Sequence, residues 1–215
     1  GDLVQEFVYD NYMRDFTSDG RSTRNVEKEY QRIIEISIPE VYDYMNRVRS
    51  GMYANKMTNY DLVTKKYIVK TFDMLEDFSN NTHLNEFASA SKKVIRRFNS
   101  LGFIYPKYHA NFNNFGDVTN SKTIQKRMSQ LQQAEATKIQ IVVPGRTDYT
   151  VGKKVRVKLN KFNPIGSDDT DITDNMFSGN YIISGVNHFI DREKHQCHME
   201  LMKDSFIVDL DKGGK

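Results

Sequence analysis

The residues best suited to chemistry lie near the C-terminus, where His195, Cys197 and His198 occur together in the sequence HQCH. Imidazole and thiolate groups are ligands that zinc prefers in proteins. Successive side chains of a β-strand point to opposite faces, so His195 and Cys197 share one face and His198 lies on the other. A tetrahedral site needs further ligands, and the other histidines are His83, His109 and His188. We therefore predict that HQCH belongs to the return strand of a hairpin and that no metal binds there.

Other kinds of chemistry have little support in the sequence. Nothing marks a base and an orienting group beside Cys197, so we expect a small buried residue there rather than a nucleophile. An acidic loop carries Asp168, Asp169, Asp171 and Asp174, but it lacks the glycine and glutamate that an EF-hand requires in register. The sequence contains no GxxxxGK[ST], GxGxxG or GxSxG motif. We predict no cofactor and no enzymatic activity.

The composition narrows the class of protein. The 215 residues include 31 Lys and Arg against 28 Asp and Glu, and the net charge of +3 argues against a general nucleic-acid-binding protein. A hydrophobic fraction of 38 % and a mean hydropathy of −0.65 predict a modest core. The single cysteine cannot form an internal disulfide, which fits a reducing compartment. No apolar run approaches the roughly 20 residues that span a bilayer, so we expect a soluble protein.

The N-terminal region mixes strands and helices. Leu3–Tyr9 alternates apolar and polar residues and precedes a polar loop, so we predict an isolated strand. Tyr30–Ile38 is a second strand candidate, and a proline before and a glycine after Glu40–Ser50 indicate a helix. Two paired strands are predicted at Met52–Thr58 and Thr64–Phe72.

Two further helices are expected in the middle of the chain. A short one is possible at Glu86–Phe98, within a region of residues 78–120 whose topology the pattern does not define. A long one is predicted at Asn120–Ala136, with Ser121 as its N-cap. Its core-facing residues should form a narrow stripe of Ile124, Met128, Leu131 and Ala134 or Glu135.

The C-terminal region is expected to be all-β. Four segments alternate with period two and are separated by turn residues, which predicts consecutive antiparallel pairing in a small barrel or sandwich. These segments are Lys138–Val143, Lys153–Leu159, Asn180–Ile190 and His195–Met202. The expected fold class is α+β, with a mixed region at residues 1–136, an antiparallel β-barrel at residues 137–205 and a C-terminal tail at residues 206–215.

The second of these strands, KKVRVKL, places three cations on one face. Lys154, Arg156 and Lys158 alternate with apolar residues that face the other way. Three interpretations remain open: a solvated barrel exterior, an electrostatic docking surface, or lumenal contact with DNA.

The order of these features is similar to the C-terminal part of the baseplate hub proteins of contractile-tailed bacteriophages, which share a fold with late-control proteins and the base of type VI secretion spikes. A helix ending in KRMSQLQQAEA is followed by TKIQIVVPG, VGKKVRVKL, an acidic loop, SGNYIISGVNHFI and HQCHMELMKD. The resemblance extends over Ser121–Ser205 and, more weakly, over Tyr30–Phe72. The residues that match the family pattern are Pro144, Gly152, Ser178, Gly179, Tyr181, Val186 and His188.

This resemblance implies a homotrimeric ring whose tail-tube-like barrels imitate a sixfold tail tube and connect it to the central spike. The implied partners are two further copies, the spike protein, the tail tube protein and other baseplate proteins. The implied location is the tail baseplate of the virion, assembled in the host cytoplasm. No membrane contact is expected in the resting state, and DNA contact is expected only during passage through the lumen. Residues expected at the assembly interface are Lys154, Arg156, Lys158, Tyr181, Ile183, His188, His195 and Cys197.

One departure from the family and two other functions have to be considered. Such hubs carry two barrels per chain, and this sequence has the pattern for one, at Thr137–Ser205, so the N-terminal barrel is either absent or represented by Leu3–Tyr9. A nucleic-acid-binding module could use Lys92–Arg97 together with the basic strand. A hydrolase could use Glu76 and Asp77, but adjacent carboxylates on one element diverge. We expect the structural role.

Overall fold

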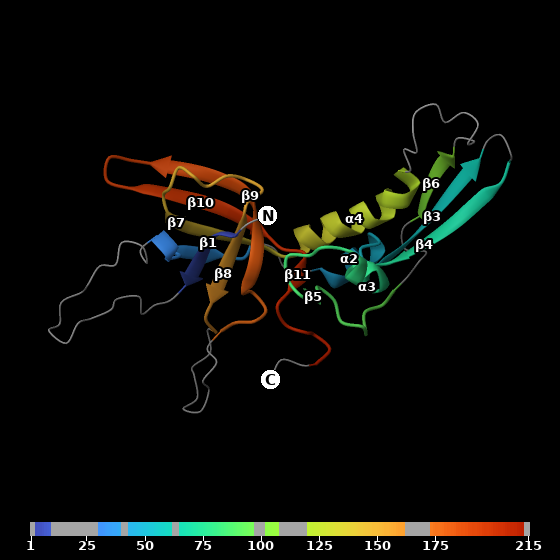
Figure 1. Cartoon of the computed structure of the whole chain (residues 1–215), viewed down its shortest axis with the longest axis horizontal. Helices are drawn as coiled ribbons and strands as arrows, with labels where there is room; N and C mark the ends of the chain where they lie inside the picture. Colours follow the sequence, from blue (N-terminus) through green and yellow to red (C-terminus); the bar gives the residue numbers. More distant parts are fainter. Residues whose placement is uncertain are drawn as a thin grey trace. The chain divides into compact units, whose positions relative to one another are not determined.

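The computed structural model describes residues 3–9, 30–39, 43–61, 65–96, 102–107, 120–161 and 173–212. They belong to two compact units, each with its own sheet (Figure 1). Each unit is assembled from segments that are distant in sequence. Unit 1 combines Gly1–Val41, His83–Phe87 and Ala136–Lys215, and unit 2 combines Tyr42–Thr82 and Ala88–Glu135.

Unit 1 is organised around a six-stranded sheet with the order β1-β8-β9-β10-β7-β2. The sheet is antiparallel except at one edge, where β1 runs parallel to β8. Its strands are β1 (Leu3–Tyr9), β2 (Glu35–Ser37), β7 (Lys138–Pro144), β8 (Lys154–Leu159), β9 (Gly179–Ile190) and β10 (His195–Met202).

The four predicted C-terminal strands are present, but the prediction of consecutive pairing is wrong for one of them. β7 pairs with the last strand, β10, instead of with β8. The prediction that Leu3–Tyr9 is isolated is also wrong, because this strand pairs along β8. The segment predicted as a strand at Tyr30–Ile38 contributes only the short β2, which covers the free edge of β7. N-terminal strands therefore complete the sheet, and residues 137–205 do not form it alone.

The two edges of this curled sheet approach each other near the N-terminal strands. An isolated bridge joins Val8 of β1 to Arg32, and the Ile33 amide donates to the Val8 carbonyl at 3.1 Å. The next amide, of Ile34, donates to the Val142 carbonyl of β7 at 2.7 Å. The chain just before β2 thus bonds to β1 as well as to β7, although no continuous ladder closes the sheet among the residues that the structure describes.

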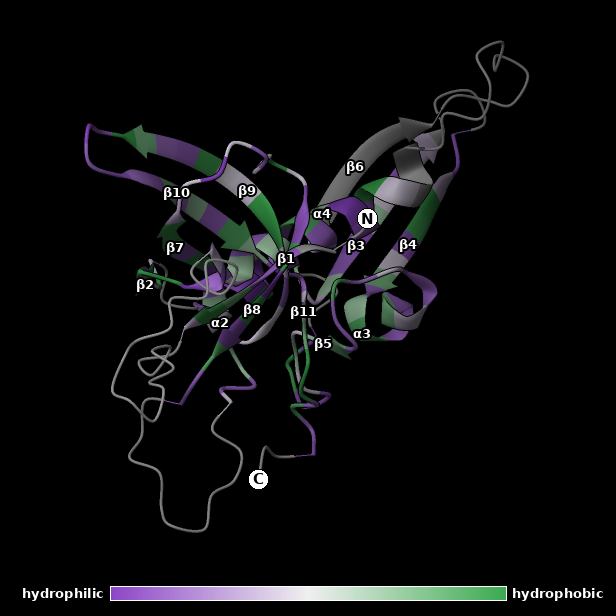
Figure 2. Ribbon diagram, turned by 60° about the vertical axis from the view of Figure 1, so that its left-hand side comes forward, coloured by the Kyte–Doolittle hydropathy of each residue, from purple (hydrophilic) through white to green (hydrophobic). Residues whose placement is uncertain are grey.

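The core of unit 1 follows from strand alternation. One face of β7 and β8 is fully buried, while the residues between face outward. Figure 2 shows the same alternation as hydrophilic and hydrophobic bands along β9 and β10. Burial of these side chains is the main favourable term for folding. The fully or nearly fully buried residues are Phe7, Ile33, Ile139, Ile141, Val143, Tyr149, Val155, Val157, Leu159, Tyr181, Ile183, Cys197, Met199 and Leu201.

A β-bulge interrupts this alternation on β9. Leu201 of β10 pairs with Ile183, but the preceding Glu200 pairs with Gly185, so one residue of β9 has no partner across the ladder. An extra residue exchanges the faces of everything that follows. Before the bulge, odd-numbered residues such as Tyr181 face the core, and after it Val186 packs against the core.

Unit 2 contains a three-stranded sheet with the order β4-β3-β6. The predicted pair of strands is confirmed as an antiparallel pair, and a third strand runs parallel to β3. The strands are β3 (Ala54–Asp61), β4 (Tyr67–Asp73) and β6 (Gly102–Lys107). The helices are α2 (Tyr44–Arg49), α3 (Met74–Asp77), the 3-10 turn η1 (Phe78–Asn80) and α4 (Asn120–Ala136).

The helix predictions for unit 2 had mixed success. The first predicted helix is the shorter α2, whose start is capped by the Asp43 carboxylate accepting from the Asn46 amide at 3.0 Å. The helix predicted at Glu86–Phe98 is wrong for residues 86–96, which form β5 (Phe87–Ala88) and turns; β5 pairs with β11 (Ser205–Phe206). No helix in the described part of the chain is long and apolar enough to cross a membrane.

The long helix α4 has the predicted bounds but packs through a polar stripe. Its buried residues are Gln125, Ser129 and Gln133, whereas Leu131 of the predicted apolar stripe is 59 % exposed. The Gln125 amide donates to the Asn55 side-chain oxygen at 2.9 Å and to the Lys70 carbonyl at 3.1 Å. Spacing by four residues aligns these side chains on one face, and hydrogen bonding offsets the cost of burying them.

We predict opposite effects for two substitutions on α4. Gln125→Met should lower the free energy of unfolding of the unit by about 1–3 kcal/mol, because it leaves the Asn55 oxygen and a strand carbonyl without their donor. Leu131→Gln should change it by less than about 0.5 kcal/mol, because that side chain is exposed. Urea denaturation followed by circular dichroism measures both. If Leu131→Gln lowered the free energy of unfolding strongly and Gln125→Met did not, α4 would pack through the predicted apolar stripe instead of the polar one.

Candidate functional site

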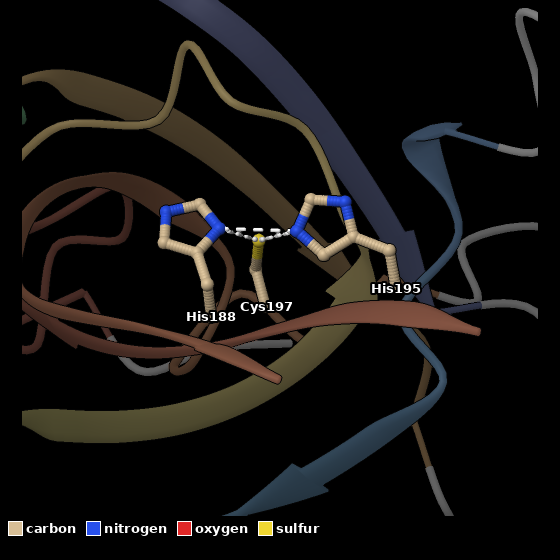
Figure 3. Close-up of side chains that lie close together, drawn as sticks. All are labelled: His188, His195 and Cys197. Carbon is tan, nitrogen blue, oxygen red and sulfur yellow. Dashed lines mark hydrogen bonds between the residues drawn. The ribbon is translucent and has the colours of Figure 1, made fainter. Parts of the chain in front are cut away.

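Three side chains with metal-binding and nucleophilic chemistry converge on the β9–β10 hairpin (Figure 3). Cys197 Sγ lies 3.2 Å from His188 Nδ1 and 4.0 Å from His195 Nε2. The two nitrogens are 3.2 Å apart, and the imidazole rings are tilted by 34° with their centroids 5.4 Å apart. The three donor atoms therefore face one common point.

Strand pairing explains why His188 joins the other two. His188 lies directly opposite Cys197 in the antiparallel ladder, and paired residues project from the same face. His195 is two residues from Cys197 on β10 and shares that face, as predicted. The bulge is needed as well, because without its phase change His188 would project from the face opposite to Tyr181. The sequence contained His188, but neither the register nor the bulge can be derived from its spacing.

The second histidine of HQCH, His198, is excluded from the cluster, as strand alternation predicted. His198 is exposed on the other face of the sheet, where its ring lies 6.5 Å from that of Phe189. There it lines a shallow groove of about 480 Å³ together with residues of β2, β7 and β9, including Gln140 and Asn187.

A glycine after β7 fixes the position of the His195 ring. The Gly145 amide donates to the His195 carbonyl at 2.8 Å, which brings the two backbones together. A Cβ atom at position 145 would lie 2.2 Å from Cγ of His195, far inside van der Waals contact. Only glycine therefore leaves room for the ring where it stands, directed at Cys197.

The three side chains of the cluster differ in their exposure to solvent. Cys197 is completely buried in the core and lies 3.7 Å from the Arg146 carbonyl, His195 is half-buried, and His188 is exposed. Burial raises the pKa of the Cys197 thiol, and the Asp148 carboxylate adds to the rise. A thiol whose pKa is raised is a poor nucleophile, so the geometry does not favour covalent catalysis by Cys197.

The other residues predicted at an assembly interface lie apart from the cluster. Tyr181 and Ile183 are fully buried in the core of unit 1, so they support the sheet from within. Arg156 and Lys158 are exposed on β8, and Lys154 is half-buried.

The basic face of β8 is partly engaged by neighbouring strands. Lys158 Nζ lies 3.0 Å from a Glu6 oxygen of β1, and Arg156 Nε donates to the Asn180 side chain of β9 at 3.3 Å. Because both members of the Lys158–Glu6 pair are accessible to solvent, the pair contributes little to stability.

The acidic loop lies largely outside the described residues, which include only Asp174 of its four predicted carboxylates. Asp174 accepts from the Met176 amide at 2.8 Å and from the Phe177 amide at 3.1 Å. Both bonds go to Oδ1, and this is the local bonding of a turn residue.

A second unusual group is Lys203, which is fully buried in unit 1. Its Nζ donates to the carbonyls of Met176 and Ser178, at 2.6 and 3.1 Å, and lies 4.9 and 4.7 Å from the ring centroids of Tyr181 and Phe206. Burial lowers the pKa of Lys203 to about 7, and Asp174 partly opposes this. The amine ties the loop before β9 to the end of β10.

Comparisons with known proteins give only weak likeness. No protein-family model and no curated protein matches the sequence. Among solved structures, the chain is similar to a tail protein from Neisseria meningitidis MC58, with 12 % identity, a TM-score of 0.43, and coverage of 95 % of this chain and 45 % of that chain. It is also similar to the 43 kDa tail protein of prophage MuSo2 from Shewanella oneidensis, with 10 % identity, a TM-score of 0.37, and coverage of 80 % and 39 %. The chain spans less than half the length of both, and likeness at this level assigns no function.

We predict that Lys203 makes stability depend on pH. Below about pH 7 its amine is protonated in both the folded and the unfolded chain; from there up to its ordinary pKa of 10.5 only the unfolded chain holds the proton. The free energy of unfolding should therefore rise with pH over this range, relative to Lys203→Met, by at most about 1.4 kcal/mol per pH unit. Urea titrations of both proteins between pH 6 and 10 measure this difference. A constant difference would mean that Lys203 stays charged when folded.

Proposed function

We propose that this chain is a structural, non-enzymatic component of a bacteriophage tail, located in the baseplate hub. In this role it forms a homotrimeric ring that connects the tail tube to the central spike, with a tail-tube-like barrel as its building block. The observation that carries the proposal is the arrangement of the segments that resemble hub proteins. They form the contiguous order β8-β9-β10-β7 within one curled sheet, to which the N-terminal strands are added.

The far end of the β9–β10 hairpin is the surface best suited to contact a neighbouring subunit. Phe189 is 52 % exposed and Ile190 is 72 % exposed, although both are large apolar residues. Lys194 Nζ lies 6.0 Å from the centroid of the Phe189 ring, which adds a charge beside the apolar surface. Exposed apolar residues next to polar ones are typical of protein interfaces.

Ion pairs made by individual basic residues weaken the alternative that this chain is a nucleic-acid-binding module. Arg96, in the predicted basic segment of residues 92–97, is paired with the Asp73 carboxylate at 2.9 Å. Lys158 of the basic strand is paired with Glu6. Cations that are engaged in this way are less available to phosphates, so DNA contact in this proposal is limited to passage through the lumen.

The proposed location is tested by the particle itself. The full-length protein in purified tails should be found at the junction of tube and spike in three copies, as determined by cryo-electron microscopy and by native mass spectrometry of the released hub. Three copies fit closed ring symmetry, in which each subunit uses the same two surfaces. A dimer or tetramer, or a location away from that junction, would refute the assignment.

We predict that the basic face of β8 guides assembly. Lys154→Glu combined with Arg156→Glu should weaken assembly with the other baseplate proteins at low salt, and the effect should shrink at high salt as screening increases. Lys158 is left unchanged because a glutamate there would face Glu6. The control is Lys66→Glu with Lys93→Glu, which makes the same charge change at exposed positions of unit 2.

Both variants should keep the circular dichroism spectrum of the parent, and sedimentation of the mixed components measures assembly. Equal assembly by the double variant and the parent at low salt would refute the docking role. An effect independent of salt would indicate a fold defect instead.

A further inference from the structure

We propose that His188, His195 and Cys197 bind a zinc ion that holds the β9–β10 hairpin in place. The site concerns unit 1 alone and does not rest on the proposed role in a tail. The sequence predicts that no metal binds here, because only His195 and Cys197 are expected on one face. The observed strand register adds His188 as a third ligand.

The distances between the donor atoms suit a tetrahedral zinc ion. With zinc bonds of about 2.0–2.1 Å to nitrogen and about 2.3 Å to sulfur, tetrahedral angles place two nitrogens about 3.3 Å apart and a nitrogen and a sulfur about 3.6 Å apart. The two nitrogens are 3.2 Å apart, and the sulfur lies 3.2 and 4.0 Å from them, which averages 3.6 Å. Small rotations of the two exposed or half-buried rings would equalise the last two distances.

The chemistry of the ligands selects the class of ion. One thiolate and two imidazoles favour zinc and other late transition metals, whereas calcium and magnesium require oxygen ligands. Three protein ligands leave one tetrahedral position for water or for a group from another molecule. Exposure of His188 gives the ion a path to the buried sulfur.

The position of the site in the sheet indicates that the ion would stabilise the β9–β10 hairpin. β8 pairs with β9 only from Gly179 to Ile182, and β7 ends at Pro144, opposite Gln196. Beyond these points the hairpin continues as two strands, which are marginally stable alone. The cluster lies where this support ends, so an ion there would join both strands beside the chain that leaves β7.

Metal binding to the tag-free full chain under reducing conditions tests the site. Zinc should bind one-to-one by calorimetry and by elemental analysis after dialysis. Cobalt(II), used as a spectroscopic probe, should give a thiolate charge-transfer band that is lost in Cys197→Ser. His188→Ala and His195→Ala should each weaken zinc binding by more than about tenfold, while His198→Ala, on the opposite face of the same strand, should leave it unchanged.

Two measurements keep the test valid if the core variant Cys197→Ser folds poorly. His188→Ala alters an exposed residue, and zinc should raise the thermal midpoint of the parent but not of this variant. Gly145→Ala retains all three ligands but displaces the His195 ring, so it should also weaken zinc binding.

Absence of stoichiometric zinc binding by the folded parent would overturn the proposal and leave the cluster as a hydrogen-bonded group. Equal losses in His198→Ala and His188→Ala would do the same, because they would indicate non-specific binding. A chain that binds zinc but does not form a trimer would refute the hub role alone, so the two proposals fail separately.

Discussion

The pairing of β9 with β10 is the constraint on which the rest of unit 1 depends. These strands lie in the middle of the sheet, and the bulge opposite Glu200 and Leu201 determines which side chains of β9 face the core. Before the bulge Tyr181 and Ile183 complete the hydrophobic core, and after it His188 meets Cys197. A shift of one residue would exchange these faces, burying polar residues and separating the cluster. Core packing and the candidate site therefore share one register.

The sequence predicted the strands of this sheet far better than their neighbours. Period-two alternation identified β7 to β10 within about two residues, because burial of one face leaves a local pattern. Pairing is not local: β1 pairs with β8, more than 140 residues later in the chain, and β2 pairs with β7, about 100 residues later, so that β1 and β2 form the two edges of the sheet. On α4 the pattern failed for another reason, since the buried face consists of Gln125, Ser129 and Gln133, whose burial depends on partners such as Asn55 in a distant strand.

The candidate site shows the same division. Alternation correctly placed His195 and Cys197 together and His198 opposite. The missing ligand, His188, lies on the neighbouring strand. Its orientation depends on the β-bulge, which no residue type in the sequence indicates. The role of Gly145 could not be predicted from the sequence. A Pro-Gly pair at a strand end indicates a turn, but the close approach of the His195 ring is known only from the fold.

The exposed end of the hairpin connects the site with the proposed role. Phe189 and Ile190 project from the hairpin beside the cluster, beyond the ladder that β8 forms with β9 and at the end of the ladder that β7 forms with β10. Fixing the backbone of a residue that is not already ordered costs about 1–2 kcal/mol of conformational entropy when a segment docks. A metal ion at the base of this hairpin would order the backbone before any partner arrives. Its contribution to assembly would then be preorganisation of the hairpin, without any contact between the ion and the neighbouring subunit.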